Sequence, residues 1–224
     1  MKGFRLRRVL FAAFTLIATV PVFCLGVWIA RDALQREVSA VEEKHLLIAR
    51  NMTAALDRYV HDTESAFRML VRGTEGAIAL KELAPLAREF GYRHFCLIDK
   101  DGKLLSALNL EDVKVAAPKS IMLWAQKNTS PKLSFSNVIA DGAGRPTIYM
   151  TQRLSNGRIA LGALGTEFIA KLQRSIAFGR KGHAAIVDRS GKILAHPKEA
   201  WRQEIKDISK IKPVQLMMAG KTSV

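Results

Sequence analysis

The chain has 224 residues, of which 49% are apolar, and a formal net charge of +15. This apolar content suffices for a packed core. The basic residues are scattered and are not interleaved with aromatic residues, which argues against a nucleic-acid-binding surface. They fit better with a basic surface that faces an anionic membrane or attracts anionic solutes. The chain has two cysteines, Cys24 in a long apolar stretch and Cys96 in a short one, which excludes a disulfide framework. No Cys and His residues have the spacing of a zinc site.

The first predicted element is a transmembrane helix at Val9–Ala30, a stretch without a charged residue. A helix of this length reaches about 33 Å, and the hydrocarbon core of a bilayer is about 30 Å thick. Basic residues crowd its N-terminal side, whereas Arg31–Lys44 mixes acidic and basic residues. The charge bias therefore predicts a cytoplasmic N-terminus (residues 1–8), a span in the bacterial inner membrane, and a periplasmic C-terminal part.

A cleaved signal peptide is the alternative interpretation of this N-terminus. Its apolar region would cover only about 7–15 residues and would end at a small-x-small site. The run in this chain is longer, and Trp28 stands where a small residue is required. The sequence favours a retained anchor.

A long helix is predicted next, over residues 31–72. Mostly apolar residues recur there in steps of three and four, and neither Gly nor Pro interrupts the stretch before Gly73. The residues of this seam are Leu34, Val38, Val41, His45, Ile48, Met52, Ala55 and Tyr59. We expect the seam to pack on a sheet, to pair with a second copy in a homodimer, or to do both.

The region 73–178 predicts an antiparallel sheet with short helices. An Asp-x-x-Gly turn at Asp99 joins two apolar runs, which indicates a hairpin over His94–Ala107. The other predicted elements are helices at Leu83–Phe90, from Pro118, and from an N-cap at Thr166 to Gly179, and strands at Lys132–Ile139, Pro146–Leu154 and Arg158–Gly165.

A second hairpin repeats the first one. The pattern Asp99-x-x-Gly102-Lys103 recurs as Asp188-x-x-Gly191-Lys192, between similar apolar runs. The repeat predicts duplicated α+β modules, the second over residues 179–224 and incomplete at Val224. Two coincidentally similar hairpins in an unrelated fold remain the alternative.

These features resemble the double Cache sensor domain of bacterial transmembrane receptors. The resemblance rests on the basic start, the membrane helix, the long helix, and the two hairpins FCLIDKDGKLLSA and GHAAIVDRSGKILAHP, and it covers residues 31–224. It implies PAS-like sheets, a small solute bound in the membrane-distal module between sheet and overlying loops, and a membrane-proximal module that passes a conformational change to a second membrane helix. A histidine kinase, diguanylate cyclase or chemotaxis output would follow.

Candidate ligand-binding residues come from the central strands. Period-two alternation places Tyr149, Thr151 and Arg153 on one face of their strand, with Ser134 on the preceding strand. The planar guanidinium of Arg153 suits a carboxylate. The predicted site residues are Trp124, Ser134, Tyr149, Thr151, Arg153 and Glu167. The alternatives are a strand face that meets water and a core role for Trp124.

The resemblance also bears on the ligand. Amino-acid-binding members carry an Arg-x-Trp-Tyr element after the helix, a later Tyr, and an acidic residue after the last strand. Here Asn128–Lys132 replaces the first element, whereas Tyr149 and Glu167 occupy comparable places for the other two. The departure argues against an amino-acid ligand. The basic surface and Arg153 favour a small anionic organic solute.

No catalytic constellation stands out in the sequence. A P-loop, a dinucleotide fingerprint, an HExxH motif and a nucleophile with matching acid and base are all missing. The chain is predicted to be a sensor without enzymatic activity, cofactor or metal. A membrane-tethered binding or docking module without signalling output is the alternative, and a second span with a cytoplasmic domain after Val224 would favour the receptor.

Overall fold

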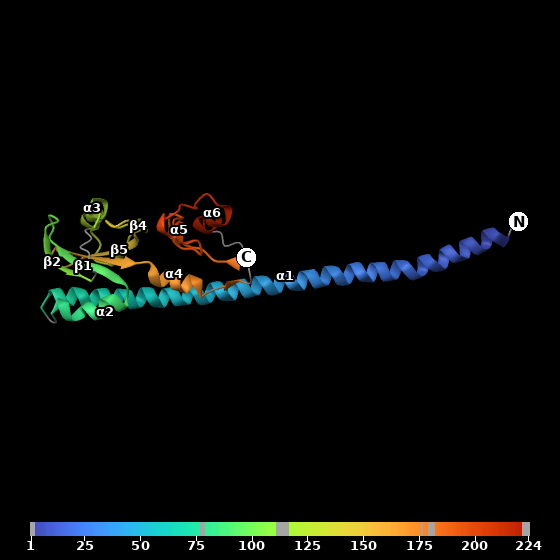
Figure 1. Cartoon of the computed structure of the whole chain (residues 1–224), viewed down its shortest axis with the longest axis horizontal. Coiled ribbons are helices and arrows are strands. Elements are labelled where there is room, and N and C mark those ends of the chain that lie inside the picture. The colour runs from blue at the N-terminus through green and yellow to red at the C-terminus, as the bar shows by residue number, and fades with distance from the viewer. Residues whose placement is uncertain (1–2, 77–78, 111–116, 176, 179–181, 221–224) are drawn as a thin grey trace. The chain divides into compact units, whose positions relative to one another are not determined.

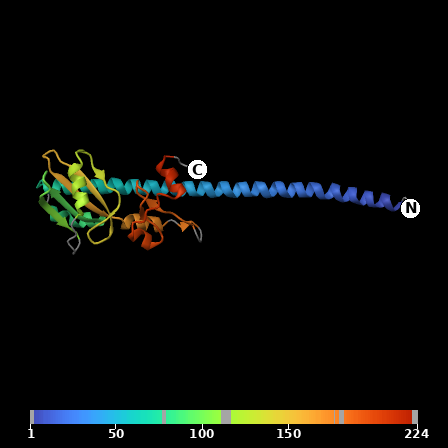
Figure 2. The same cartoon turned by 90° about the horizontal axis from the view of Figure 1, so that it is seen from above.

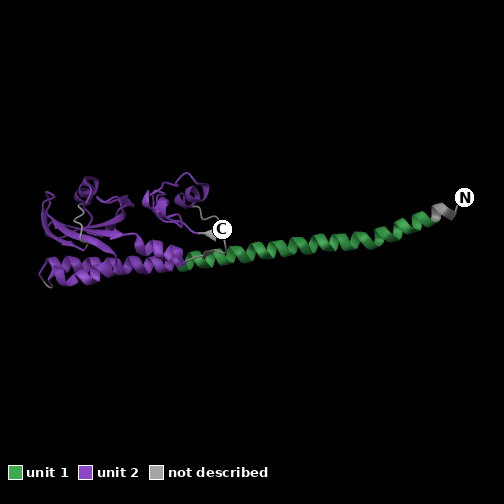
Figure 3. Ribbon diagram, viewed as in Figure 1, with its two compact units in different colours: residues 1–51, 224 green, residues 52–223 purple. Residues whose placement is uncertain are grey.

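The computed structural model describes residues 3–76, 79–110, 117–175, 177–178 and 182–220 (Figure 1). The chain separates into two compact units, residues 1–51 and residues 52–223 (Figure 3). Helix α1 (Gly3–Thr74) contributes to both units. The module boundaries expected from the sequence stay predictions.

The first unit is the N-terminal part of α1. The predicted anchor and the predicted long helix form one continuous helix, with Pro21 inside it. Large apolar side chains between Val9 and Ile29 are exposed. Among the described residues, α1 is the one helix long and apolar enough to cross a membrane. The helix ends at Thr74, where Gly73 and Gly76 were expected to end it.

The second unit is built on a six-stranded antiparallel sheet, in the order β2-β1-β6-β5-β3 with β4 beside β5. Its strands are β1 (Tyr92–Ile98), β2 (Leu104–Asn109), β3 (Ser134–Phe135), β4 (Ile139–Ala140), β5 (Pro146–Arg153) and β6 (Ile159–Gly165). The predicted α+β fold and its first hairpin, β1–β2, are confirmed.

Helices cover both faces of this sheet. On one face the C-terminal part of α1 and the short helices η1 (Leu80–Leu83) and α2 (Ala84–Glu89) pack against a core that includes Phe67 and Met150. On the other face α3 (Lys119–Lys127) lies over the strands (Figure 2) and packs against Tyr149. The expected alternation along β5 is therefore confirmed, because Tyr149 and its neighbour Met150 belong to opposite cores.

The prediction of a single strand at Lys132–Ile139 is wrong. Two short strands, β3 and β4, replace it, because the pairing with β5 is interrupted between Phe135 and Ile139. The Ser136 side chain accepts the N–H of Tyr149 at 2.9 Å, and the N–H of Val138 donates to Asp188 Oδ2 at 3.0 Å. A side chain and a distant carboxylate thus take the place of ladder bonds.

The N-cap position predicted for the next helix is confirmed. Thr166 is the N-cap of helix α4 (Glu167–Arg174), but its hydroxyl makes no capping bond. It accepts instead from Arg202 Nη1 at 3.3 Å. The helix ends at Arg174, and the predicted end at Gly179 lies outside the described residues.

The second hairpin forms as predicted. Its strands are β9 (Ile186–Val187) and β10 (Ile193–Ala195), which pair antiparallel around the turn at Asp188. Gly102 and Gly191 occupy equivalent turn positions with φ of +85° and +83°. The remaining elements of this part are β7 (Ala177–Phe178), β8 (Gly182–His183), α5 (Glu199–Gln203) and α6 (Lys212–Met218).

Candidate functional site

The face of the sheet below α3 carries a fully buried tyrosine, Tyr149. Tyr149 on β5 has no exposed surface, and its hydroxyl has no partner among the described residues. Its ring lies 6.0 Å from that of His94 on β1. Burial raises the pKa of Tyr149, and the negative charge of Asp141 raises it further. Since buried polar groups are almost always satisfied, this hydroxyl marks a place for an acceptor from outside the described residues.

Three other predicted site residues lie near this face. Trp124 on α3 is half-buried and packs against the cluster that contains Tyr149. Thr151 is buried, and its hydroxyl donates to the carbonyl of Ala160 at 3.2 Å. Ser134 is the partner of Thr151 in the β3–β5 register. The structure therefore brings Trp124 to Tyr149 and Ser134 to Thr151, although the Thr151 hydroxyl is occupied by backbone.

Arg153, at the end of β5, contacts backbone carbonyls. Its guanidinium donates to Gln126 O at 2.9 Å, Asn128 O at 3.2 Å and Gly157 O at 3.4 Å. These bonds tie the C-terminal end of α3 to the β5–β6 turn. A guanidinium held in this way positions α3, and carboxylate binding by Arg153 stays a prediction.

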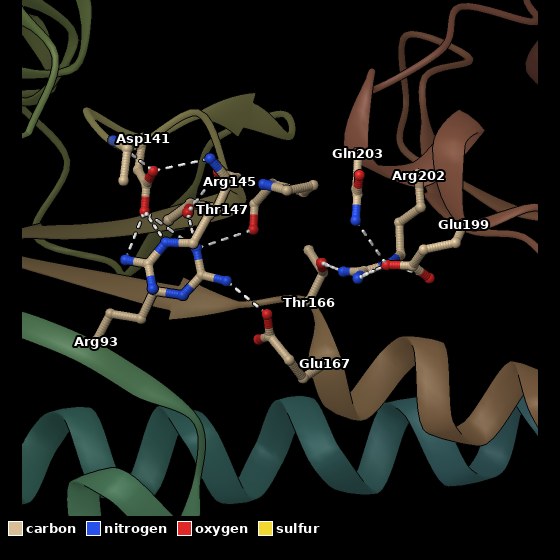
Figure 4. A network of polar contacts seen from close by, with 11 residues as sticks. Arg93, Asp141, Arg145, Thr147, Thr166, Glu167, Glu199, Arg202 and Gln203 are labelled. Atoms are coloured by element: carbon tan, nitrogen blue, oxygen red, sulfur yellow. Dashed lines mark hydrogen bonds and ion pairs between the residues drawn. The ribbon is translucent and has the colours of Figure 1, made fainter. Parts of the chain in front are cut away.

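Glu167, the first residue of α4, pairs with an arginine that the sequence did not single out. Its Oε1 lies 2.6 Å from Arg93 Nη2 (Figure 4). Arg93 Nη1 also lies 2.5 Å from Thr147 Oγ1 and 3.2 Å from both Asp141 Oδ2 and the carbonyl of Pro146. One buried guanidinium thus joins β1 to the β4–β5 loop and to α4.

Asp141 is the buried anion of this network, with a side chain that is 2% exposed. Burial alone would raise its pKa, but the N–H groups of Arg145 and Ala143 and the charge of Arg145 outweigh burial and lower it. Arg145 Nη2 lies 3.0 Å from Oδ2. Asp141 is therefore a carboxylate that the protein holds in its ionised form.

Sequence reasoning missed both Arg93 and Asp141. The β1–β6 register shifts between Tyr92 and His94, so Arg93 is an extra residue at a bulge, which re-aims its side chain. In the sequence, Arg93 is a single charge at a strand, and Asp141 reads as a turn residue before Gly142. No local pattern connects the two.

A second polar cluster lies beside the first (Figure 4). Arg202 on α5 pairs with Glu199 one turn earlier and donates to the hydroxyl of Thr166 at 3.3 Å. The hydrogen bond from Arg202 is the leading cause that lowers the pKa of Glu199. Because Thr166 directly precedes Glu167, the two clusters meet at the start of α4.

Searches with the sequence find no matching protein-family model and no matching curated protein. Solved structures are similar in fold. They include the ligand-binding domain of the Pseudomonas aeruginosa PAO1 amino acid chemoreceptor PctB in complex with L-Gln, at 17% identity and a TM-score of 0.54 over 74% of this chain and 72% of that chain.

Two further structures have a comparable likeness. The ligand-binding domain of the Pseudomonas fluorescens chemoreceptor CtaA in complex with L-alanine has 19% identity and a TM-score of 0.51 over 78% of this chain and 77% of that chain. The extracellular domain of a histidine kinase, rpHK1S-Z16, has 16% identity and a TM-score of 0.52 over 69% of this chain and 70% of that chain. This chain therefore has the fold of receptor sensor domains, as its resemblance to double Cache sensors implied.

Proposed function

We propose that this chain is the extracytoplasmic ligand-sensing part of a bacterial transmembrane signalling receptor. The observation that carries the proposal is the fold shared with ligand-binding domains of chemoreceptors and with the extracellular domain of a histidine kinase. Helix α1 adds a segment long and apolar enough to hold such a domain at a membrane. The charge bias around it favours an inner-membrane anchor with residues 52–223 in the periplasm.

The ligand site that we propose lies between the sheet and α3, at Tyr149. A phenol hydroxyl buried without an acceptor costs roughly 1–3 kcal/mol, and a ligand that supplies the acceptor recovers this energy. Since Tyr149 has no exposed surface, a ligand reaches the hydroxyl only when α3 moves. Arg153 anchors one end of α3 and thereby limits this movement.

The ligand class that we propose is a small organic solute bearing a carboxylate. A carboxylate accepts a hydrogen bond from the Tyr149 hydroxyl, and residues 31–224, with 31 basic and 20 acidic residues, carry a net charge of +11 that attracts anions. The PctB and CtaA domains were solved with L-Gln and L-alanine, and both of these molecules carry a carboxylate. Organic acids and amino acids are therefore the two groups to compare.

The seam of α1 supports a homodimer. Leu34, Val38 and Val41 are 62%, 49% and 51% exposed, so this apolar stripe has no partner within the described part of the chain. A second copy would cover it in the manner of a coiled coil. Oxidative crosslinking of Val38→Cys in a Cys24→Ser background should give a dimer. Arg36→Cys, about 200° away around the helix, should not.

A thermal-shift screen of the full chain in detergent tests the sensor function. Succinate, L-glutamine, ethanolamine and adenine represent organic acids, amino acids, amines and purines. We expect succinate or L-glutamine to raise the melting temperature. Stabilisation by ethanolamine alone would contradict a carboxylate ligand, and no stabilisation by any small solute would favour a tethered docking module.

A further inference from the structure

The two Asp-x-x-Gly turns differ in what their aspartates contact. In the first turn, Asp99 Oδ1 accepts the N–H of Asp101 at 2.9 Å and that of Lys103 at 2.8 Å. In the second, Asp188 Oδ1 accepts the N–H of Ser190 at 2.8 Å and that of Lys192 at 3.0 Å. The two carboxylates therefore close their own turns in the same way.

Asp188 also accepts the hydroxyl of Ser190 within the turn at 2.7 Å, and a further bond leaves its hairpin. Its Oδ2 accepts the N–H of Val138 at 3.0 Å, and Val138 is fully buried between β3 and β4. A pocket of about 550 Å³ lies at this junction and is lined by Glu64 of α1, by Val138 and by Asp188 itself. Leu194 and Ala195 of β10 belong to the same hydrophobic cluster as Val138, so this hydrogen bond adds a directional polar contact to the apolar packing between the two segments.

The same segment is bonded to the strand that carries Tyr149. The N–H of Ser136 donates to the carbonyl of Tyr149 at 2.8 Å, and the N–H of Tyr149 donates to Ser136 Oγ at 2.9 Å. Val138 follows two residues later. Hydrogen bonds thus join the backbone of Tyr149 to Ser136 and that of Val138 to Asp188, and two residues of covalent backbone connect Ser136 to Val138.

We propose that Asp188 is a positioning residue that couples the second hairpin to the β3–β4 segment, so that a displacement at Tyr149 reaches the second module. The coupling rests on the proposed function for its biological meaning, since a ligand at Tyr149 would cause the displacement. Two sites can be coupled in this way only if the connecting element responds to both of them. The β3–β4 segment, bonded to β5 on one side and to Asp188 on the other, is that element.

The duplicated turn supplies a matched control. In Asp188→Asn the amide keeps one acceptor oxygen for the turn, but its NH₂ group then faces the N–H of Val138, so two donors oppose each other. In Asp99→Asn the acceptor oxygen is likewise kept, and Asp99 Oδ2 has no bond to another segment in the described part of the chain. The first variant removes this one bond between the modules and leaves the bond from Arg202 to Thr166 in place, and the second removes neither.

Amide hydrogen exchange of the full chain in detergent, without any ligand, tests the coupling. We expect Asp188→Asn to raise exchange roughly tenfold or more in the segments 136–140 and 186–195, since a bond to a charged acceptor is lost. Asp99→Asn should leave both segments unchanged. Equal exchange in the two variants would overturn the proposal.

The same exchange experiment with added ligand distinguishes failure of the coupling from failure of the proposed sensing function. With succinate or L-glutamine at saturation, the wild-type chain should change its exchange at 186–195, and Asp188→Asn should bind with an unchanged Kd but lose that distant response. A distant response that persists in Asp188→Asn would overturn the coupling. If neither compound binds the wild-type chain, the carboxylate-sensing function fails, and the ligand-free comparison still decides the role of Asp188.

Discussion

Arg93 and Asp141 form an ion pair inside the second unit, with Arg93 Nη1 at 3.2 Å from Asp141 Oδ2 and side chains that are 7% and 2% exposed. The pair joins the bulge of β1 to the loop between β4 and β5. Through Glu167 the same guanidinium reaches α4, which leads into the second module. The arginine therefore fixes three segments that are distant in sequence.

Removing the buried partner of Arg93 should be far costlier than removing the exposed one. We expect Asp141→Asn to lower the free energy of unfolding by about 3 kcal/mol, because the buried guanidinium of Arg93 loses its buried counter-charge and keeps the exposed Glu167 as an anionic partner. Glu167→Gln should cost less than about 1 kcal/mol, since the Glu167 side chain is 62% exposed. Urea unfolding of both variants measures the difference, and equal losses would contradict the assigned burial.

The lowered pKa of Asp141 makes stability depend on acid pH. Its folded pKa lies below the ordinary carboxyl value of about 3.9, so the unfolded state binds the proton first. The contribution is therefore present above about pH 4 and is lost as the pH falls through the folded pKa. The melting temperature, measured between pH 2 and 7, should fall more steeply with decreasing pH for wild type than for Asp141→Asn. An equal pH dependence in the two proteins would show that Asp141 does not contribute.

The sequence predicted those features that local patterns encode. The length of the stretch without charged residues predicted the membrane span, and apolar residues in steps of three and four predicted α1. Glycine at a fixed turn position predicted both hairpins, and Gly102 and Gly191 have the positive φ that the turns require. These signals are local, because backbone geometry and helix or strand periodicity are set within a few residues.

The missed features depend on contacts between distant segments. Arg93 is aimed by a bulge that exists only in the β1–β6 pairing. The break between β3 and β4 depends on Asp188, which lies fifty residues beyond Val138. Arg153 had a suitable chemistry for a carboxylate, but its actual acceptors are carbonyls brought near by α3. Residue type alone does not identify such partners.

The core below α1 should be sensitive to the loss of one aromatic ring. Phe67 is fully buried, and its ring lies 5.5 Å from that of Phe95 in an edge-to-face arrangement. Phe67→Ala should lower the free energy of unfolding by about 3–5 kcal/mol. Met69→Ala on the same helix, at a side chain 43% exposed, should cost less than about 1 kcal/mol. Comparable losses would place Phe67 outside the core.

Arg153 should control the mobility of α3. Arg153→Ala removes the bonds to Gln126 and Asn128, so we expect faster amide exchange over Lys119–Lys127 and faster association of a ligand below α3. Arg158→Ala changes an exposed arginine on the neighbouring turn and should alter neither rate. If Arg153→Ala abolishes binding while exchange of α3 stays unchanged, direct ligand contact by Arg153 would be the better explanation.

The two buried tyrosines of the sheet should respond oppositely to loss of their hydroxyls. Tyr92 donates to the carbonyl of Thr63 at 2.7 Å, so Tyr92→Phe should cost about 1 kcal/mol of unfolding free energy. The Tyr149 hydroxyl has no partner among the described residues, so Tyr149→Phe should be neutral or stabilising without ligand. Destabilisation of both variants would mean that the Tyr149 hydroxyl is already bonded in the free protein.

Calorimetric titration of wild type and Tyr149→Phe, with whichever of succinate and L-glutamine stabilises the chain more, tests the sensor site most directly. Loss of the hydroxyl donor to a charged carboxylate should raise Kd by about 10–100-fold, while the ligand-free variant stays at least as stable as wild type. An identical Kd in both proteins would contradict a site below α3 at Tyr149.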